Sequence, residues 1–252
     1  MQPEFYEHVY SVQGTHWWGN SRRLLSLELL RRSGLAKGCR HIDIGSGTGQ
    51  NLGLLDPLKP SLTIGIDLSP IALKFARKAR PDSRLVRCDL NHALPFADGA
   101  FDVATVFNVL YHSWVTSESA VFSEIRRVLQ PGGLLLITEP AFPALAREVD
   151  IIDMAARRYR LRPFVRMLET ANFTVELSTY FTSFGAPIIL GMKAMKTLRA
   201  GAKGDKRPAD LRMNNRFLNS VLFMAAGYEG KLIKASVPMP FGTTLLCLAR
   251  RR

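Results

Sequence analysis

Cysteine, acidic residues and long apolar runs are all scarce in this chain of 252 residues. The three cysteines, Cys39, Cys88 and Cys247, stand far apart, and their spacing fits neither a disulfide framework nor a zinc site. No apolar run approaches the roughly 20 residues of a spanning helix, and the first residues form no basic leader followed by an apolar block. We therefore expect a cytoplasmic protein of a reducing compartment that holds no metal and does not span a membrane.

The shortage of acidic side chains leaves a large positive charge. Lys and Arg number 34 against 21 Asp and Glu, which gives a formal net charge of +13. This excess favours an anionic partner, either a nucleic acid, an anionic membrane surface or an acidic small molecule. The alternative is that the basic side chains only solvate the surface. Hydrophobic residues make up 47% of the chain, which suffices for the core of one α/β domain.

Short apolar segments alternate with amphipathic segments along most of the chain. We expect Ser21, Ser69 and Ser117 to cap helices, and Gly34 and Asn172 to end them. Alternating strands and helices of this kind fold as a mostly parallel sheet with helices on both faces. The expected strands are residues 40–44, 62–66, 85–88, 101–107, 134–138, 174–181 and 243–249.

A glycine-rich loop follows the first expected strand. Gly45, Gly47 and Gly49 alternate with other residues, and such a backbone can turn tightly and let a ligand approach closely. We expect a helix to follow this loop. A dinucleotide-binding fingerprint would place a glycine where Gln50 stands, so the spacing does not match that motif.

Three aspartates stand at the ends of consecutive expected strands. Asp43 precedes the glycine loop, Asp67 ends the second strand 18 residues after Gly49, and Asp89 ends the third strand. In open parallel sheets, ligands bind beyond the carboxyl ends of the strands. An acid in the position of Asp67 can accept both hydroxyls of a ribose, and a carboxylate at Asp89 can accept the exocyclic amine of a purine. The pattern predicts a nucleoside site.

These motifs resemble those of the class I S-adenosylmethionine-dependent methyltransferases. The resemblance implies a Rossmann-like α/β fold, with a seven-stranded sheet that is mostly parallel, a last strand that is antiparallel and helices on both faces. It also implies S-adenosyl-L-methionine as cofactor and S-adenosyl-L-homocysteine as product. The segments that match in order and spacing are 43–49 (DIGSGTG), 65–70 (GIDLSP), 88–90 (CDL), 94–102 (LPFADGAFD), 108–112 (NVLYH) and 128–133 (VLQPGG).

The resemblance also assigns roles to residues of this chain. It implies that Asp43 faces the amino group of the cofactor, that Asp67 binds the ribose hydroxyls and that Asp89 accepts the adenine amine. The loop that would hold the methionine part consists of Gly45, Ser46, Gly47, Thr48 and Gly49. The other implied contacts are Leu68 under the adenine, Cys88 and Leu90 beside it, and Asn108 and Val109 after the fourth strand.

The N-terminal residues carry a second, narrower resemblance. His16-Trp17-Trp18, followed by Arg22 and Arg23, is similar to an N-terminal element of a bacterial subgroup that often acts on small molecules. We expect residues 1–39 to form a helical lid on a cofactor-binding domain of residues 40–252. In this lid, Trp17 would close over the cofactor, and Arg23 or Arg22 would pair with its carboxylate. The alternatives are a tryptophan pair within the core and arginines on a solvated helix face.

Four residues are candidates for a general base, which is needed only if the acceptor arrives protonated. His112 lies just past the fourth strand, Glu139 ends the fifth strand, and Tyr10 and His16 belong to the expected lid. Three of them have a structural alternative. His112 would cap the following helix, His16 would pack on the first helix, and Glu139 would pair with an arginine of residues 157–166.

Residues 185–240 separate the last two expected strands. We expect them to form a helical insertion that caps the substrate end of the sheet. Between residues 193 and 216, eight basic residues stand with two acids, and the apolar positions at the start of this stretch recur at helical spacing. This stretch either packs on the domain or makes a peripheral contact with an anionic membrane.

The sequence therefore predicts a methyltransferase that acts by in-line displacement on a small organic acceptor. The acceptor would be a metabolite, a peptide carboxylate or a lipid-linked compound, with oxygen as the favoured attacking atom. The first alternative is an RNA methyltransferase that binds nucleic acid through its basic surface. The second is a fold that binds the cofactor but transfers no methyl group.

Overall fold

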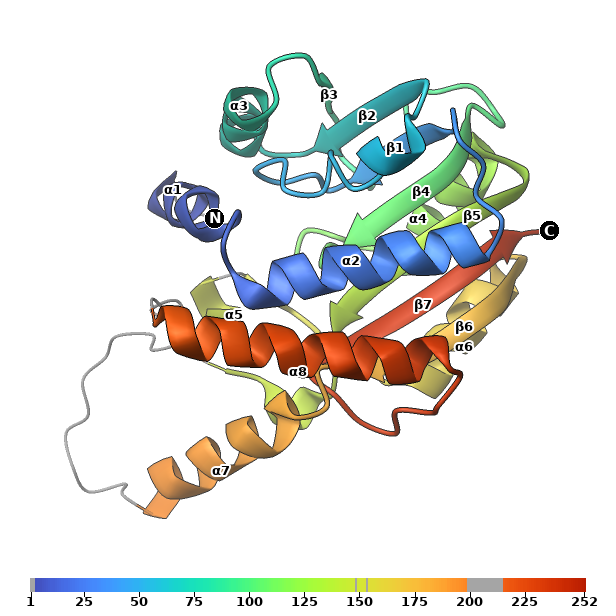
Figure 1. Cartoon of the computed structure of the whole chain (residues 1–252). Coiled ribbons are helices and arrows are strands. Elements are labelled where there is room, and N and C mark those ends of the chain that lie inside the picture. The colour runs from blue at the N-terminus through green and yellow to red at the C-terminus, as the bar shows by residue number, and fades with distance from the viewer. Residues whose placement is uncertain (1–2, 148, 153, 199–214) are drawn as a thin grey trace.

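A computed structural model of the chain describes residues 3–147, 149–152, 154–198 and 215–252. Its centre is a seven-stranded sheet in the order β3-β2-β1-β4-β5-β7-β6 (Figure 1). β1 to β5 pair in parallel, and β7 runs antiparallel between β5 and β6. The strands are β1 (Arg40–Ile44), β2 (Leu62–Asp67), β3 (Arg84–Arg87), β4 (Phe101–Phe107), β5 (Leu129–Pro140), β6 (Phe173–Phe181) and β7 (Thr244–Arg251). The predicted seven-stranded sheet with a reversed last strand is confirmed.

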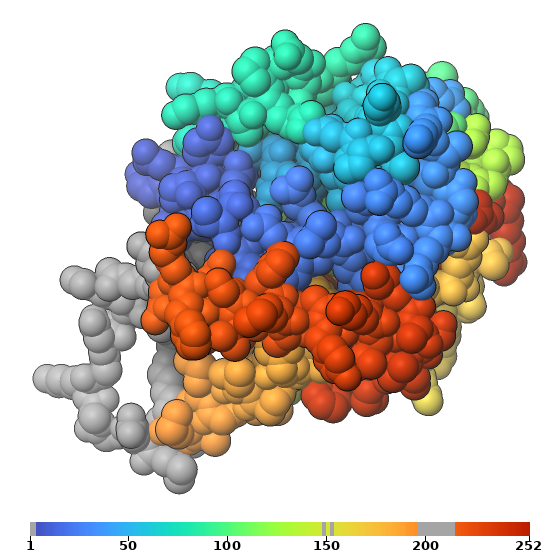
Figure 2. Space-filling model, viewed as in Figure 1, coloured from blue at the N-terminus to red at the C-terminus, as the bar shows by residue number. Residues whose placement is uncertain are grey.

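Helices cover both faces of the sheet. α2 (Trp17–Arg32) and α8 (Arg216–Lys234) lie side by side on one face, and α4 (Glu118–Val128) and α6 (Leu161–Thr170) lie on the other. Figure 2 shows α8 crossing the front surface next to α2. The other elements are α1 (Pro3–Val12), α3 (Pro70–Ala79), α5 (Val149–Ile152), α7 (Gly185–Leu198) and the short 3-10 helices η1 (Asp56–Leu58) and η2 (Pro143–Leu145). Within the described part of the chain, no helix is long and apolar enough to cross a bilayer.

Residues along each central strand alternate between two hydrophobic cores. Val106 of β4 belongs to the core formed with α4 and α6, whereas Phe107 belongs to the core formed with α2 and α8. This period of two is required of a strand that is buried on both faces. On β1, Ile42 and Ile44 belong to the first core. Asp43, which stands between them, therefore points toward α2.

Local signals place most of the helix ends correctly. The hydroxyls of Ser69 and Ser117 accept amide protons at the starts of α3 and α4, as predicted. Gly34 and Asn172 adopt left-handed backbone conformations after α2 and α6, with φ of +82° and +61°. A glycine or asparagine in this conformation ends a helix at little steric cost, so both predicted stops are confirmed.

Two helix predictions are wrong. α2 begins before Ser21, because the side chain of His16 caps the helix by accepting the amide proton of Trp18. No α-helix follows the glycine loop, and the chain instead makes turns up to η1. Leu54 and Leu55 of this segment pack in one core with Leu29 and Leu30 of α2.

The segments around the last three strands also differ from expectation. β5 begins at Leu129, before the expected strand at 134–138, and its pairing with β4 is irregular between Leu129 and Leu134. The insertion between β6 and β7 includes α8, which packs beside α2 on one face of the sheet. Ala226 and Ile233 of α8 belong to the hydrophobic core on that face. Only the first turns of α8 and α7 lie near the carboxyl ends of the parallel strands (Figure 1). Most of the predicted basic stretch at 193–216 lies outside the described residues.

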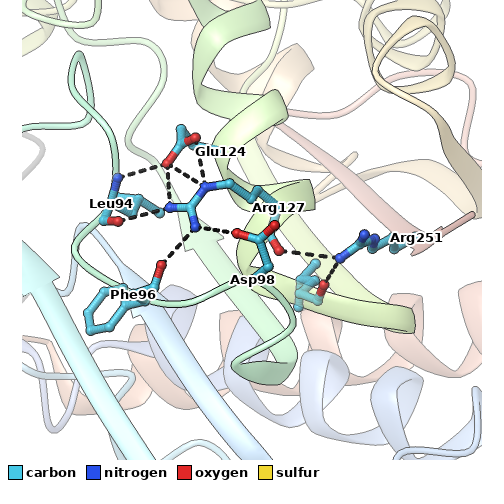
Figure 3. Close-up of polar contacts among 7 residues, drawn as sticks. Leu94, Phe96, Asp98, Glu124, Arg127 and Arg251 are labelled. Atoms are coloured by element: carbon cyan, nitrogen blue, oxygen red, sulfur yellow. Dashed lines mark hydrogen bonds and ion pairs between the residues drawn. The ribbon is translucent and has the colours of Figure 1, made fainter.

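One arginine fixes the connection between β3 and β4 (Figure 3). The Arg127 guanidinium donates to the carbonyl oxygens of Leu94 and Phe96 at 2.9 and 2.8 Å. It also pairs with Asp98 and Glu124, in both cases at 2.8 Å. The Glu124 carboxylate in turn accepts the amide proton of Leu94. Charge-assisted bonds of this kind are stronger than neutral ones, so the connection is held in one conformation against α4.

We expect Arg127→Ala to lower the free energy of unfolding by about 2–3 kcal/mol, because several charge-assisted hydrogen bonds are lost together. The Nε atom of the neighbouring Arg126 is buried and has no hydrogen-bond partner, so Arg126→Ala serves as the matched control and should cost about 0.5 kcal/mol. Urea denaturation measures both values. Equal losses in the two variants would contradict the role assigned to Arg127.

Candidate active site

The glycine loop after β1 has one open side. At Gly47, which has a φ of +54°, a Cβ atom would meet no heavy atom within 4 Å. At Gly45 a Cβ would lie 2.3 Å from a methyl carbon of Val109, and at Gly49 it would lie 2.9 Å from the Cα of Ala76. Gly45 and Gly49 are therefore needed for close packing, whereas Gly47 leaves the backbone accessible from outside.

Asp67 connects this loop to the end of β2. Its Oδ2 accepts the amide proton of Gly47 and its Oδ1 accepts that of Ser69, each at 2.8 Å. Burial raises the pKa of Asp67, and the two backbone donors oppose that shift. Each carboxylate oxygen can accept more than one hydrogen bond. Asp67 can therefore order the loop and still accept hydroxyl groups.

A hydrogen-bonded chain of three side chains lies beneath the loop, on the side of the sheet that faces α2. The Thr105 hydroxyl donates to Oδ1 of Asp43 at 2.7 Å, and Nε2 of His41 lies 2.8 Å from the same hydroxyl. Because the hydroxyl proton is used on Asp43, His41 must be the donor. Burial lowers the pKa of His41 to about 3 and raises the pKa of Asp43 to about 7. His41 is therefore neutral, and the Asp43 carboxyl group changes its protonation state near neutral pH.

Arg22 brings a buried positive charge to the same place. Its side chain is 3% exposed, and its guanidinium carbon lies 4.4 Å from the ring centre of Trp18 and 4.6 Å from that of Phe107. Burial lowers the pKa of Arg22 to about 10. The negative charge of Asp43 makes the largest contribution in the opposite direction. Arg22 therefore remains protonated at neutral pH.

The buried charges of Arg22 and Asp43 are not fully satisfied. Nε of Arg22 and Oδ2 of Asp43 are both buried, and neither has a hydrogen-bond partner. Orphaned charged atoms of this kind are costly in a folded protein. A ligand that carries both an ammonium and a carboxylate group would satisfy the two atoms together. These residues therefore fit the amino-acid part of S-adenosylmethionine.

The segment between α1 and α2 is fastened to the glycine loop. The Thr48 hydroxyl donates to the Gln13 side chain, and Gln50 Nε2 donates to the Gln13 carbonyl at 2.6 Å. Gly19 permits this contact, since a Cβ there would lie 2.4 Å from Gln50 Nε2. Sequence reasoning missed Gln13, because a glutamine outside any motif gives no signal of its contact.

The predicted N-terminal site residues lie in three different surroundings. Tyr10 packs against Phe75 of α3, with 5.1 Å between ring centres. His16 caps α2, and burial lowers its pKa. Trp17 packs on His16 and Phe184, away from the glycine loop. The predictions of Tyr10 as a base and of Trp17 as a cofactor contact therefore have no support in their side-chain contacts.

The Glu139 side chain is hydrogen-bonded to the backbone and is not available as a free base. Its carboxylate is fully buried and accepts the amide protons of Val109, Leu110 and Tyr111 at 2.8–3.2 Å. Burial raises its pKa to about 8, and the three amide donors oppose that shift. The alternative of an ion pair with residues 157–166 is also wrong, since the Glu139 oxygens accept backbone amide protons while Arg157 pairs with Glu118 and Arg158 with Asp150.

His112 lies in an aromatic stack after β4. Its ring is 4.0 Å from that of Tyr111 and 3.9 Å from that of Trp114, and the residue is 6% exposed. Ser117 caps the following helix, so the predicted capping role of His112 is wrong. Burial and stacking hold the imidazole in place without exposing it.

The remaining predicted residues border the ends of β2, β3 and β4. Leu68 is exposed, and Cys88 and Leu90 are half-buried. Asp89 accepts the backbone and side-chain amide protons of Asn91 through one oxygen. Asn108 adopts a positive φ of 58° at the end of β4. In the described ranges, no cluster of three or more His, Cys, Asp or Glu side chains is arranged to hold a metal ion.

Arg22 and Arg23 have different electrostatic surroundings. Arg22 faces Asp43 and Glu139, whereas the strongest charged neighbours of Arg23 are Asp56 and Arg80. Asp43 therefore interacts more strongly with Arg22 than with Arg23, although it acts on both.

Comparison with known protein families gives a consistent match. A family profile described as a methyltransferase domain matches residues 42–137. The chain is 31% identical to a demethylmenaquinone methyltransferase of Thermus thermophilus, over 65% of this chain and 73% of that protein. It is 33% identical to a malonyl-[acyl-carrier protein] O-methyltransferase of Legionella pneumophila, over 64% and 55% of the two chains.

Other relatives match a smaller part of the chain. A 23S rRNA (guanine(748)-N(1))-methyltransferase of Streptomyces fradiae is 33% identical over 45% of this chain and 38% of its own length. The chain spans between a third and about half of the length of several curated relatives that it matches.

Solved structures share the fold at low sequence identity. A putative sarcosine dimethylglycine methyltransferase from Galdieria sulphuraria superposes with a TM-score of 0.63 and 15% identity, over 99% of this chain and 97% of that one. A Haemonchus contortus phosphoethanolamine N-methyltransferase 2 in complex with S-adenosyl-L-methionine gives a TM-score of 0.58 at 20% identity, over 89% and 51% of the two chains.

We expect Thr105→Val to lower the free energy of unfolding by about 2–3 kcal/mol, because it leaves His41 and Asp43 without their shared hydroxyl. Thr105→Ser keeps that hydroxyl and should cost no more than about 1 kcal/mol for the lost methyl group. Chemical denaturation at neutral pH compares the two variants. A valine variant as stable as the serine variant would contradict the hydrogen-bonded chain.

Proposed function

Because the chain belongs to the S-adenosylmethionine-dependent methyltransferases, we propose that it transfers the methyl group of that cofactor to an oxygen atom of a small organic acceptor. The observation that carries this proposal is the buried pair of opposite charges, Arg22 and Asp43, whose free atoms are satisfied by an amino acid. The names of two relatives support the acceptor class, since one acts on demethylmenaquinone and one on a malonyl-carrier protein as an O-methyltransferase.

We assign different residues to the three parts of the cofactor: the amino-acid part, the ribose and the adenine. We assign the carboxylate to Arg22 and the ammonium group to Asp43, which Thr105 and His41 hold in place. We assign the ribose hydroxyls to Asp67, whose oxygens retain accepting capacity. For the adenine amine we retain Asp89, because Asn91 engages only its Oδ1.

The rest of the predicted site is proposed with the same roles. The open backbone at Gly47 would contact the methionine part, with Gly45, Ser46, Thr48 and Gly49 shaping the loop. Residues 1–39 would act as a lid, since Gln13 already holds this segment on the loop. The adenine would lie among Leu68, Cys88 and Leu90, and Asn108 and Val109 would border the methyl group.

The side chains near the site favour an acceptor that arrives already ionised. S-adenosylmethionine supplies a methyl group activated by a positively charged sulfur. The protein must then align the attacking atom and exclude water. Glu139 and His16 both use their acceptor atoms on backbone amides, so neither is free to remove a proton. A carboxylate acceptor needs no base, and a carboxylate oxygen is therefore the attacking atom that we propose.

An RNA acceptor is the competing function. It is favoured by the relative named as a 23S rRNA methyltransferase and by the net charge of +13. The surface helices argue against it, because large apolar side chains are exposed beside the basic ones. RNA binding through phosphates would not call for them.

The experiment that tests the proposed function offers the protein both acceptor classes with methyl-labelled cofactor. One reaction contains a mixture of small carboxylic acids and the other contains total RNA. Label in volatile, base-labile esters would support the proposal, since methyl esters release methanol in alkali. Label in RNA would favour the competing function. Cofactor binding without transfer to either would contradict an acceptor of the proposed class.

Arg22→Met should weaken the binding of S-adenosylhomocysteine by at least about thirtyfold, because a buried carboxylate loses its partner. The same change should also lower the stability of the unliganded protein, because it leaves the buried Asp43 carboxylate with less compensating positive charge, so the affinities are measured where both proteins are folded. Arg23→Met is the matched control and should change the affinity less than about threefold. Calorimetry measures both affinities.

A second ligand separates this role from a general defect. 5′-Methylthioadenosine keeps the nucleoside but has no amino-acid part, so it should bind the Arg22→Met variant as well as it binds the unchanged protein. A loss of affinity for both ligands would show that Arg22 acts through the fold.

The affinity for S-adenosylhomocysteine should depend on the ionisation of Asp43. Its pKa of about 7 lies well above the value of an exposed aspartate, because burial disfavours the charge. Only the ionised form pairs with an ammonium group. The affinity should therefore fall as the pH falls through about 7, by up to about tenfold per pH unit, and it should also fall at high pH as the ligand amine loses its proton.

Asp43→Asn provides the control for this pH dependence. The variant should bind the ligand weakly, and the rise in affinity between acidic and neutral pH should disappear. Calorimetric titrations across that range test the assignment. An unchanged rise in the variant would assign the titration to another group.

A further inference from the structure

α8 has apolar residues on two opposite faces. Its inner face is buried against α2 and the sheet, with Ala226, Gly230 and Ile233 at helical spacing. Glu229 lies on the same side, and its carboxylate accepts hydrogen bonds from the amide and hydroxyl of Ser183. One face therefore accounts for the packing of α8 on the domain.

The outer face of α8 carries a second apolar stripe that nothing in the described structure covers. Its four residues follow one another at intervals of four, three and four positions, which places them on one side of a helix. They are Phe217, Val221, Met224 and Tyr228, with exposed fractions of 77%, 37%, 65% and 65%. Figure 2 shows α8 on the outer surface of the molecule. Packing on the domain does not explain this stripe.

α7 has a similar stripe. Ile188, Met192 and Met195 stand four and three positions apart, and their exposed fractions are 55%, 48% and 52%. α7 projects from the body next to α8 (Figure 1) and contacts mainly η2. An extended apolar surface of this kind marks a site of interaction.

The charged side chains on the described parts of both helices are almost all basic. Arg216 and Lys231 are exposed, and Lys193 and Lys234 are half-buried. The sole acid in residues 185–198 and 215–234 is Glu229, which is buried. The outer surface therefore combines large apolar side chains with positive charge and exposes no negative charge.

We propose that the outer faces of α7 and α8 dock this protein on an anionic phospholipid membrane, with α8 lying in the plane of the interface. Helices with an apolar face flanked by Lys and Arg bind such surfaces by burying apolar area and by attraction to acidic headgroups. The charge favours this occupant over a second copy of the chain, because two such faces would bring like charges together. The exposed Phe217 and Met224 favour it over RNA, which offers phosphates and no acyl chains.

Membrane docking would place the cofactor site near the bilayer. Asn219, in the second turn of α8, accepts the amide proton of Trp17 and donates to the carbonyl of Thr15. The same N-terminal segment is fastened to the glycine loop through Gln13. The docking surface is thus connected to the site by two sets of hydrogen bonds, although the proposal does not depend on which acceptor is methylated.

Vesicle co-sedimentation tests the proposal with the full chain. We compare vesicles of phosphatidylcholine alone with vesicles that also contain phosphatidylglycerol, at low and at high salt. The protein should bind the anionic vesicles at least about tenfold more tightly than the neutral ones, and high salt should reduce the difference. Absence of binding to anionic vesicles would overturn the proposal.

Variants identify the surface. Phe217→Ser, Met224→Ser and Tyr228→Ser together should weaken binding to anionic vesicles by at least about tenfold, because three large apolar side chains are removed from the interface. Leu24 and Ile151 are also exposed apolar residues, at 59% and 79%, and lie outside α7 and α8. Leu24→Ser with Ile151→Ser is therefore the matched control and should leave binding unchanged. Phe217→Ser alone should give a smaller loss than the triple variant.

Four further measurements make the outcome decisive: thermal unfolding, affinity for S-adenosylhomocysteine, sedimentation and RNA binding. Thermal unfolding and the affinity for S-adenosylhomocysteine should be the same in the triple variant and the unchanged protein, so that a loss of vesicle binding reports on the surface. Equal vesicle binding by the triple variant would overturn the proposal. So would sedimentation or RNA-binding data in which the triple substitution abolishes a dimer or an RNA complex and leaves vesicle binding intact.

Discussion

The burial of one positive charge against the face of the sheet is the constraint on which the rest of the site depends. Arg22 is enclosed by Trp18 and Phe107, and Asp43 on β1 is the negative group that most strongly favours its charged form. A buried guanidinium is stable only where opposite charge or polar groups compensate it. In this protein the compensation is partial, because Nε of Arg22 and Oδ2 of Asp43 have no partners. We propose that this deficit prepares the site for an amino-acid ligand.

The position of α2 follows from the same constraint. α2 packs on the face of the sheet toward which Asp43 points, and residues 45–55, where a helix was expected, form turns. α2 can then deliver Arg22 to the sheet. Gln13, just before α2, holds the loop from the other side through Thr48 and Gln50. The segment before α2 and the glycine loop are consequently one hydrogen-bonded unit, and a change in either should affect the other.

The sheet and its motifs were predictable from the sequence because they depend on local signals. Strand residues alternate between the two faces of the sheet with a period of two. Ser69 and Ser117 cap the helices that follow them, and the glycines and aspartates stand at strand ends. The contacts that complete the site were not predictable, because they join residues far apart in the chain. Thr105 and His41 look like ordinary strand residues until the register between β1 and β4 pairs Asp43 with Thr105. Glu139 was a candidate general base because it ends β5 toward the site, but its oxygens accept hydrogen bonds from three backbone amides.

The most direct test of this account is a crystal structure of the protein with S-adenosylhomocysteine bound. The account predicts that the carboxylate of the ligand contacts Arg22, that its ammonium group contacts Asp43, and that its ribose hydroxyls contact Asp67. A ligand whose amino-acid part lies away from Arg22 and Asp43 would contradict the central claim, because the buried charges would then be unsatisfied for a reason unrelated to the cofactor.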